Sequence, residues 1–414
     1  MTTAPLPPAF RRLAWSNLAA QGSEQVALAA APLVAVVALG AGASETAWLQ
    51  AAGTLPFLLC AIPAGILADR AARNRLLAGA EALRLGAALA TLVLLGGGWL
   101  GIGGLALLTA LGAVGTVVYT VAAPALVPAL VPRASLADAN RAIELARAVA
   151  FAAGPALGGA AVGALGAPAA YSVAAALSLA AVLLLAGLPT AAPLQPVVRN
   201  VRRDLAEGAR FVAGHRLLRP ILVTAVAFNL SWFVLMGVFV AYAVERLGLD
   251  PAATGLVLAA YGLGTVTGAL GAPVLVRRFR FGLNVAIGPV AALVGSLAVA
   301  ATLLHPSGFL AAFGLFLFGA GPIVWTITTT TLRQAVTPDR MLGRVSALIV
   351  MATAGARPLG AGLAALVAAR FGVETCLLLS LAGFALQAAL VLASPLARLA
   401  ALPAEGSPDA VAAV

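Results

Sequence analysis

Continuous apolar stretches of about twenty residues recur along this 414-residue chain. A helix of that length crosses the ~30 Å hydrocarbon core of a bilayer at 1.5 Å per residue. Hydrophobic residues make up 62% of the chain and charged residues 9%, which is more apolar surface than a water-soluble fold buries. Strands of a membrane barrel would alternate polar and apolar residues, and these stretches do not alternate. The sequence therefore predicts an all-α membrane protein with twelve spans. The predicted spans are 13–38, 45–68, 75–95, 102–127, 138–163, 168–189, 218–243, 252–276, 282–303, 308–334, 342–368 and 373–394.

The arginines predict the orientation of these spans. The chain has no lysine, and an even number of spans puts both termini on one side of the membrane. Twenty of the 25 basic residues fall on that side, and only Arg246 and Arg370 fall on the other. The positive-inside rule therefore predicts cytoplasmic termini. Since topology accounts for the net charge of +11, no nucleic-acid partner is needed to explain it.

The second half of the chain repeats the first. A shift of about 203 residues lays NRAIELARAVAFAAGPALGG, from Asn140, on GRVSALIVMATAGARPLGAG, from Gly343, so that Pro155 meets Pro358. Six crossings return the chain to its starting side, so the two six-helix units run parallel. Parallel repeats of this kind are a transporter architecture, with the substrate site between the halves near the membrane midplane.

These features divide the chain into four parts. Residues 1–189 and 218–394 form the two six-helix halves. Residues 190–217 contain an amphipathic pattern, with arginines on one face and apolar residues on another, which predicts an interfacial helix that tethers the halves. Residues 395–414 form a polar tail that we expect to be disordered.

Two motifs resemble those of the major facilitator superfamily, and the resemblance covers essentially the whole chain. GILADRAARNR, residues 65–75, resembles the superfamily signature between helices 2 and 3, with Ala72 in place of its second glycine and Asn74 in place of its last basic residue. AGPALGG, residues 153–159, resembles the helix-5 antiporter motif, with Ala150 in place of its first glycine. LVPRASLADAN and DLAEGARFVAGHRLLRP resemble the branch of enterobactin exporters and macrolide efflux proteins. The resemblance implies the major facilitator fold.

The first motif places an acidic residue where its own helix disfavours it. A negative charge at a helix C-terminus opposes the helix dipole, and the resemblance implies that Asp69 instead faces the start of helix 11, near Arg344. Such a contact forms only while the cytoplasmic faces of the halves touch, so it would hold the outward-open state. The alternative is simple positive-inside retention, which explains the arginines and leaves Asp69 unexplained. The predicted cytoplasmic gate comprises Gly65, Asp69, Arg70, Arg73 and Arg344.

The helix-5 motif has two compatible interpretations. Its small residues allow close approach of helices, and its proline permits a kink. The resemblance additionally implies a hinge or seal that favours antiport. The residues concerned are Gly154, Pro155, Gly158 and Gly159.

A polar stripe in the first span gives the best candidate for a transport site. Asn17, Gln21, Glu24 and Gln25 fall at i, i+4, i+7 and i+8, which is one face of a helix. Polar side chains are costly against lipid and tolerated in a wet cavity. Glu24 lies near the midplane, where a buried carboxylate can load and release a proton. Arg147 and Arg357, on helices 5 and 11, could neutralise Glu24 or hold an anionic substrate; an internal ion pair that only fixes packing is the alternative.

Weaker candidates line the same region. Asn229, Trp232 and Trp325 are plausible cavity residues, although buried aromatics often serve packing alone. Glu81 with Arg84, and Glu144 with Arg147, are spaced i, i+3 and could pair within their helices. The sequence contains no protease, hydrolase or nucleotide-binding motif, so we expect no enzyme activity, no cofactor and no metal site.

The favoured function is proton-coupled export of a small amphipathic molecule by alternating access, as in multidrug resistance. The molecule could be a drug, a siderophore or a secondary metabolite. Uptake by symport or facilitated diffusion is one alternative, and a transport-dead sensor on the same fold is another. The expected partners are the substrate, protons and the lipid bilayer. We expect a monomer in the inner (cytoplasmic) membrane of the cell.

Overall fold

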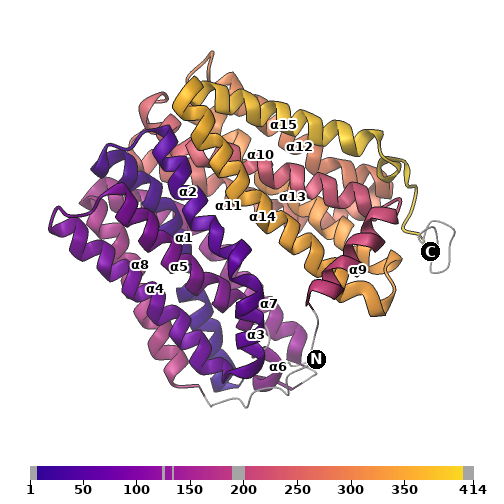
Figure 1. Cartoon of the computed structure of the whole chain (residues 1–414), viewed down its shortest axis with the longest axis horizontal. Helices are drawn as coiled ribbons and strands as arrows, with labels where there is room; N and C mark the ends of the chain where they lie inside the picture. Colours follow the sequence, from indigo (N-terminus) through magenta and orange to yellow (C-terminus); the bar gives the residue numbers. More distant parts are fainter. Residues whose placement is uncertain (1–6, 124–125, 133–134, 189–200, 404–414) are drawn as a thin grey trace.

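The structure is a computed structural model that describes residues 7–123, 126–132, 135–188 and 201–403 (Figure 1). All regular secondary structure in these ranges is helical. The elements are α1 (Pro8–Leu39), α2 (Ala43–Leu59), α3 (Ala61–Arg70), α4 (Arg73–Gly96), α5 (Ile102–Ala122), α6 (Val127–Leu130), α7 (Leu136–Leu165), α8 (Ala167–Ala186), α9 (Val201–Gly214), α10 (Leu218–Glu245), α11 (Pro251–Arg278), α12 (Phe281–Ala301), α13 (Gly308–Val336), α14 (Asp339–Phe371), α15 (Val373–Ala393) and the 3₁₀ turn η2 (Pro395–Arg398).

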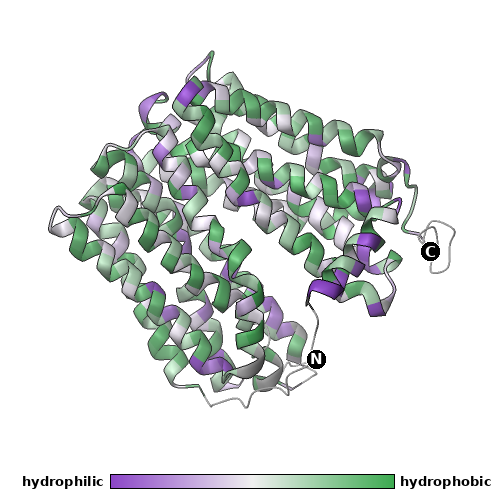
Figure 2. Cartoon of the chain, viewed as in Figure 1, coloured by the Kyte–Doolittle hydropathy of each residue, from purple (hydrophilic) through white to green (hydrophobic). Residues whose placement is uncertain are grey.

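The prediction of a twelve-span helical membrane protein is confirmed. Within the described ranges, eleven helices are long and apolar enough to cross a bilayer. The twelfth span is a bent pair, α2 with α3, whose axes differ by 45°. Figure 2 shows the corresponding pattern: the sides of the helices are mainly hydrophobic, and hydrophilic residues gather on α9 and at helix ends.

Proline chemistry accounts for the bend in the second span. The sequence predicts one continuous helix over 45–68, whereas the structure breaks it at Cys60. Pro63 lacks an amide hydrogen and its ring crowds the carbonyl of Leu59, one turn earlier. The chain therefore bends between α2 and α3, at the entrance to the charged loop that follows.

The two halves of the chain form two helix bundles (Figure 1). Helices α1–α8 make up one bundle and α10–α15 the other, and α9 lies beside the second bundle. The predicted repeat is visible in the helices themselves, because α7 and α14 begin 203 residues apart, at Leu136 and Asp339. Pro155 and Pro358 both lie inside their helices.

The bundles converge at one end and their ribbons diverge toward the end where α9 lies (Figure 1). We call the latter end the α9 side. The contacts between bundles are made chiefly by α7 with α11, and by α2 with α14 and α10. The first turns of α2 and α11 lie at the end opposite α9 and contact the other bundle there, so that end of the molecule is the closed one.

The start of the C-terminal tail differs from expectation. We predicted disorder from residue 395, but η2 is ordered and Leu396 is fully buried. The amide of Gly282 donates to the carbonyl of Leu399 at 2.8 Å, which fixes the tail to the first turn of α12. The tail is ordered because Leu396 buries its apolar side chain and because the tail supplies an acceptor to an amide at the start of α12, which has no partner within its own helix. Residues 404–414 lie outside the described ranges.

Candidate functional site: a polar cavity between the two bundles

A cavity of about 850 Å³ lies between the bundles. Its walls come from both halves and include Glu24 at the middle of α1 and Arg357 at the middle of α14. The lining continues toward the α9 side as far as Thr120 and Arg333, which lie near the ends of α5 and α13. In the other direction the lining ends about two helical turns from the opposite end, at Leu49 of α2 and Leu258 of α11, so the cavity spans the middle of the protein and reaches the α9 side.

Close backbone packing shuts the opposite end. A Cβ added at Gly159 of α7 would lie 2.5 Å from the Pro251 carbonyl oxygen and 2.7 Å from the Gly255 Cα atom of α11. The hydroxyl of Ser44 also donates to the carbonyl of Ala365 on α14 at 2.9 Å. Only glycine permits such an approach of two helices.

The rest of the helix-5 motif packs within its own bundle. A Cβ at Gly154 would meet Gln25 of α1 at 2.3 Å, and a Cβ at Gly158 would meet the Val26 carbonyl oxygen at 3.0 Å. Pro155 lines the cavity. The motif thus lets α7 lie against α1 on one side and α11 on the other. Its association with antiport stays a prediction.

Three of the four predicted stripe residues face the cavity. Gln21, Glu24 and Gln25 line it, whereas Asn17 does not. Asn17 is buried, and its amide donates to the Ile143 carbonyl of α7 at 3.5 Å. Asn17 lies on the same face of α1 as Glu24, but seven residues earlier, which is about 10 Å along the helix axis. At that position α7 covers α1. The inclusion of Asn17 in the cavity was therefore wrong.

The charges around Glu24 differ from the prediction. Glu24 makes no hydrogen bond or ion pair with any described residue, and Arg84 of α4 and Arg357 of α14 line the same cavity. Arg147 also lines the cavity, but it pairs with Glu144 of its own helix at 2.6 Å and is half exposed. Arg147 was one of two candidates to neutralise Glu24 or hold a substrate anion; here a carboxylate one turn away already binds it, and its role at Glu24 stays a prediction.

Arg84 belongs to a buried network that the sequence signalled only as an i, i+3 pair. Its guanidinium lies 2.5 Å from the carboxylate of the fully buried Glu81 and donates to the Ala20 carbonyl of α1 at 2.8 Å. The hydroxyl of Ser178 donates to the other Glu81 oxygen at 3.3 Å and shares a hydrogen bond with Ser23, the neighbour of Glu24. A buried pair of this kind holds α1, α4 and α8 in one register.

Arg357 is placed by aromatic rings and an amide. Its Nε atom donates to the Asn229 side-chain oxygen at 3.3 Å. The guanidinium carbon lies 5.5 Å from the ring centroid of Phe57, in the N-terminal bundle, and 5.7 Å from that of Phe233, in the C-terminal bundle. These are cation–π distances. Arg357 and Asn229 thus line the cavity together, and their role in transport stays a prediction.

An aromatic wall stands on the C-terminal side of the cavity. Trp232 stacks on Tyr261 with ring centroids 5.1 Å apart and on Phe228 at 6.2 Å. Trp325 also lines the cavity, and its indole nitrogen is buried without a hydrogen-bond partner in the described part of the chain. The sequence identified the two tryptophans, but nothing in it marked the phenylalanines or Tyr261, because aromatic residues recur in many spans.

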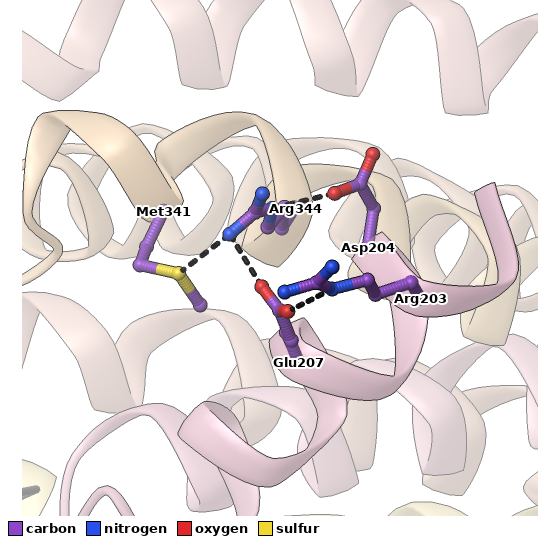
Figure 3. A network of polar contacts seen from close by, with 5 residues as sticks. All are labelled: Arg203, Asp204, Glu207, Met341 and Arg344. Carbon is purple, nitrogen blue, oxygen red and sulfur yellow. Dashed lines mark hydrogen bonds and ion pairs between the residues drawn. The ribbon is translucent and has the colours of Figure 1, made fainter. Parts of the chain in front are cut away.

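A second charged cluster lies on the α9 side (Figure 3). Arg344, near the start of α14, donates to Asp204 at 2.7 Å and to Glu207 at 2.5 Å, both on α9. The hydrogen bond from Arg203, with the charge of Arg344 nearby, lowers the pKa of Glu207. In this conformation Arg344 is therefore bound by α9, the helix that links the two halves. The only hint of this cluster in the sequence was the i, i+3 spacing of Asp204 and Glu207, which puts two carboxylates on one face of a helix.

The remaining gate residues surround the bend after α2. Gly65 lies in α3 with open space around its Cα atom, and Arg73 is buried at the start of α4. The side chains of Asp69 and Arg70 lie outside the described residues. The predicted latch requires contact between the bundles on the α9 side, where the cavity opens, so the latch stays a prediction for the opposite conformation.

The fold and the cavity define a membrane transporter of the major facilitator type. The profile of a family described as transmembrane secretion effector matches residues 1–410, and the chain belongs to that family. No curated protein matches the chain in a sequence search. The resemblance to the enterobactin-exporter and macrolide-efflux branch stays a prediction.

Solved structures share the fold at low sequence identity. The nucleoside transporter NupG is 13% identical, with a TM-score of 0.74 over 93% of this chain and 98% of that one. A bacterial homologue of the iron transporter ferroportin in the inward-facing state is 17% identical, with a TM-score of 0.74 over 93% and 98%. A bacterial homologue of the human lysosomal transporter Spinster, inward-facing and unoccupied, is 14% identical, with a TM-score of 0.71 over 94% and 97%.

Proposed function

We propose that the protein is a proton-coupled antiporter that exports a small amphipathic molecule across the cytoplasmic membrane. In this proposal the α9 side is cytoplasmic, as the arginine distribution indicates, and the structure represents the inward-open state. The protein works as a monomer, with both termini in the cytoplasm.

The position of Glu24 carries the proposal. It is the only carboxylate among the described cavity-lining residues, and it has no hydrogen-bonded partner in that set. It lies at the middle of α1, roughly 24 Å from Pro8 along the axis. A proton and a cationic or hydrogen-bond-donating substrate group would compete for this one site. Such competition couples proton entry to substrate exit.

The surrounding charges make Glu24 responsive to its occupant. Arg84 attracts it, and Glu81 repels it while neutralising Arg84. Arg357 attracts it from the other bundle. A proton on Glu24 removes one attraction between the bundles, and a change of that kind can shift the balance of two conformations.

Proton movement in proteoliposomes tests the proposal. Vesicles loaded with a pH-sensitive dye would receive a panel of macrolides, siderophores and aromatic dyes from outside. Antiport predicts that an entering substrate drives protons out and makes the lumen more alkaline. Symport predicts acidification, and a sensor or facilitator predicts no change; either outcome contradicts the proposal.

Glu24→Gln supplies the matched variant. It preserves size and removes the titratable charge, so proton movement should be lost while downhill exchange of substrate continues. Glu45→Gln is the control, because Glu45 is an exposed residue at the start of α2 that accepts a hydrogen bond from the amide of Gly42. Full proton coupling in Glu24→Gln would assign Glu24 to packing.

A further inference from the structure

The charged groups of the cavity divide into neutralised pairs and unpaired groups. Among the described residues, one glutamate and four arginines line it. Arg84 is neutralised by Glu81 and Arg147 by Glu144, each within its own helix. Arg333 lies three residues before the end of α13, at the mouth on the α9 side. In the described part of the chain, the middle of the cavity therefore holds one carboxylate without an ion-pair partner, Glu24, and one such guanidinium.

That guanidinium, Arg357, has capacity for an anion. Arginine carries five N–H donors, and among the described contacts only Nε is used, on the neutral amide of Asn229. The two Nη groups form the fork that binds carboxylate, phosphate or sulfonate in a bidentate manner. The rings of Phe57 and Phe233 hold the guanidinium plane without neutralising its charge.

Glu24 and Arg357 face the same cavity from opposite bundles. They attract each other electrostatically, but they are not within ion-pair distance. Between the bundles they present one negative and one positive group, beside the aromatic wall of Phe228, Trp232 and Tyr261. A ligand that complements all three features carries a cation, an anion and an aromatic body.

We propose that the substrate is a zwitterionic aromatic molecule of the amino-acid-derivative type. Its acidic group binds Arg357, its ammonium group binds Glu24, and its ring packs against the aromatic wall of Phe228, Trp232 and Tyr261. This inference rests on the proposed function, since only the ammonium group competes with the proton at Glu24. Bridging of the two bundles by one molecule also gives the substrate a direct hold on both moving parts.

Three fluorescent probes with one chromophore test the charge requirement. Nε-dansyl-lysine is zwitterionic, its methyl ester is cationic, and its Nα-acetyl derivative is anionic. Each is titrated into the purified full-length protein, and binding is followed by energy transfer from the cavity tryptophans to the dansyl group. The zwitterion should bind at least about tenfold more tightly than either partner, the effect of one charge-assisted hydrogen bond.

Single substitutions assign each charge. Arg357→Gln should weaken the zwitterion and the anion about tenfold or more and leave the cation unchanged. Glu24→Gln should weaken the zwitterion and the cation and leave the anion unchanged. Arg370→Gln, on an exposed arginine at the far end of α14, is the control and should change nothing.

The outcomes separate the substrate class from the transport mechanism. Equal binding of the three probes, no binding of any, or probe affinities indifferent to Arg357→Gln would overturn the zwitterion proposal. Binding with the expected charge pattern but without proton movement in proteoliposomes would instead overturn the antiport proposal and leave the substrate class standing. If Glu24 and Arg357 served only to hold the structure together, the affinities of the three probes would not change on substitution of either residue, and the proposal would be overturned.

Discussion

The contact between Gly159 and α11 should control which side of the protein is open. In the structure, a Cβ at Gly159 would lie 2.5 Å from the Pro251 carbonyl oxygen, and ordinary contact begins at 3.4 Å. The Gly159→Ala substitution therefore requires α7 and α11 to separate by about 0.9 Å, since the opposing atoms are backbone and cannot rotate away. Separation of these helices opens the end that the structure closes.

The size of the effect follows from the cost of overpacking. One extra methyl group in a well-packed contact costs ~1–3 kcal/mol, and that cost falls only on the conformation in which α7 and α11 touch. The equilibrium should shift about 5-fold to about 150-fold away from the conformation described here. The folded protein is retained, because the other conformation relieves the clash.

Cysteine labelling measures that shift. Thr120→Cys places a thiol on the exposed, cavity-lining end of α5, in a background in which Cys60 and Cys376 are replaced by serine. Its rate of modification by a water-soluble maleimide should fall at least about fivefold when Gly159→Ala is added.

The matched control is Gly112→Ala, also in α5, where an added Cβ meets no atom within 4 Å. It should leave the labelling rate unchanged. An unaltered rate in a folded Gly159→Ala variant would refute the claim that this contact closes the far end of the protein.

Three further predictions concern the α9 side. Arg344→Gln removes two solvent-accessible charge-assisted contacts to α9, and exposed ion pairs of this kind contribute modestly to stability, so amide exchange in α9 should accelerate severalfold; Arg340→Gln, on the same surface, should leave it unchanged, and an unaltered rate in Arg344→Gln would count against the anchor. Burial lowers the pKa of His215, whose Nδ1 atom accepts from the amides of Leu217 and Leu218. Protonation turns that acceptor into a donor, so the stability from this turn is present above the unfolded histidine pKa of about 6.5 and is lost as pH falls through the lower folded value. The amide exchange rate of the α9–α10 turn, relative to the intrinsic rate at each pH, should rise below pH ~6. His215→Asn should abolish this pH dependence; an equal dependence in both proteins would exclude His215 as its source. A reporter fused after residue 402 should be active only in the cytoplasm, and periplasmic activity would reverse the orientation.

The sequence alone determined the features that depend on local periodicity. Apolar runs of bilayer length set the number of spans, because a helix in lipid satisfies its backbone hydrogen bonds within itself. The 203-residue repeat predicted that the chain forms two parallel six-helix halves. Helical spacing alone also put Gln21, Glu24 and Gln25 on one face of α1, and that face lines the cavity.

Tertiary structure decided which groups meet across helices. Asn17 shares the stripe of Glu24, but α7 covers it, and the position of α7 over α1 depends on glycines more than a hundred residues away. Arg84, which the sequence marked only as an i, i+3 partner of Glu81, lines the cavity with Glu24. Arg147 was already bound within its own turn, and a one-dimensional pattern does not rank such competing partners.

The same limit applies to the two sites between distant segments. Arg357 lies between phenyl rings contributed by α2 and α10, and Arg344 is bound by two carboxylates of α9, about 140 residues earlier in the chain. Local sequence fixes the direction in which a side chain leaves its helix. The packing of helices against one another fixes what that side chain reaches.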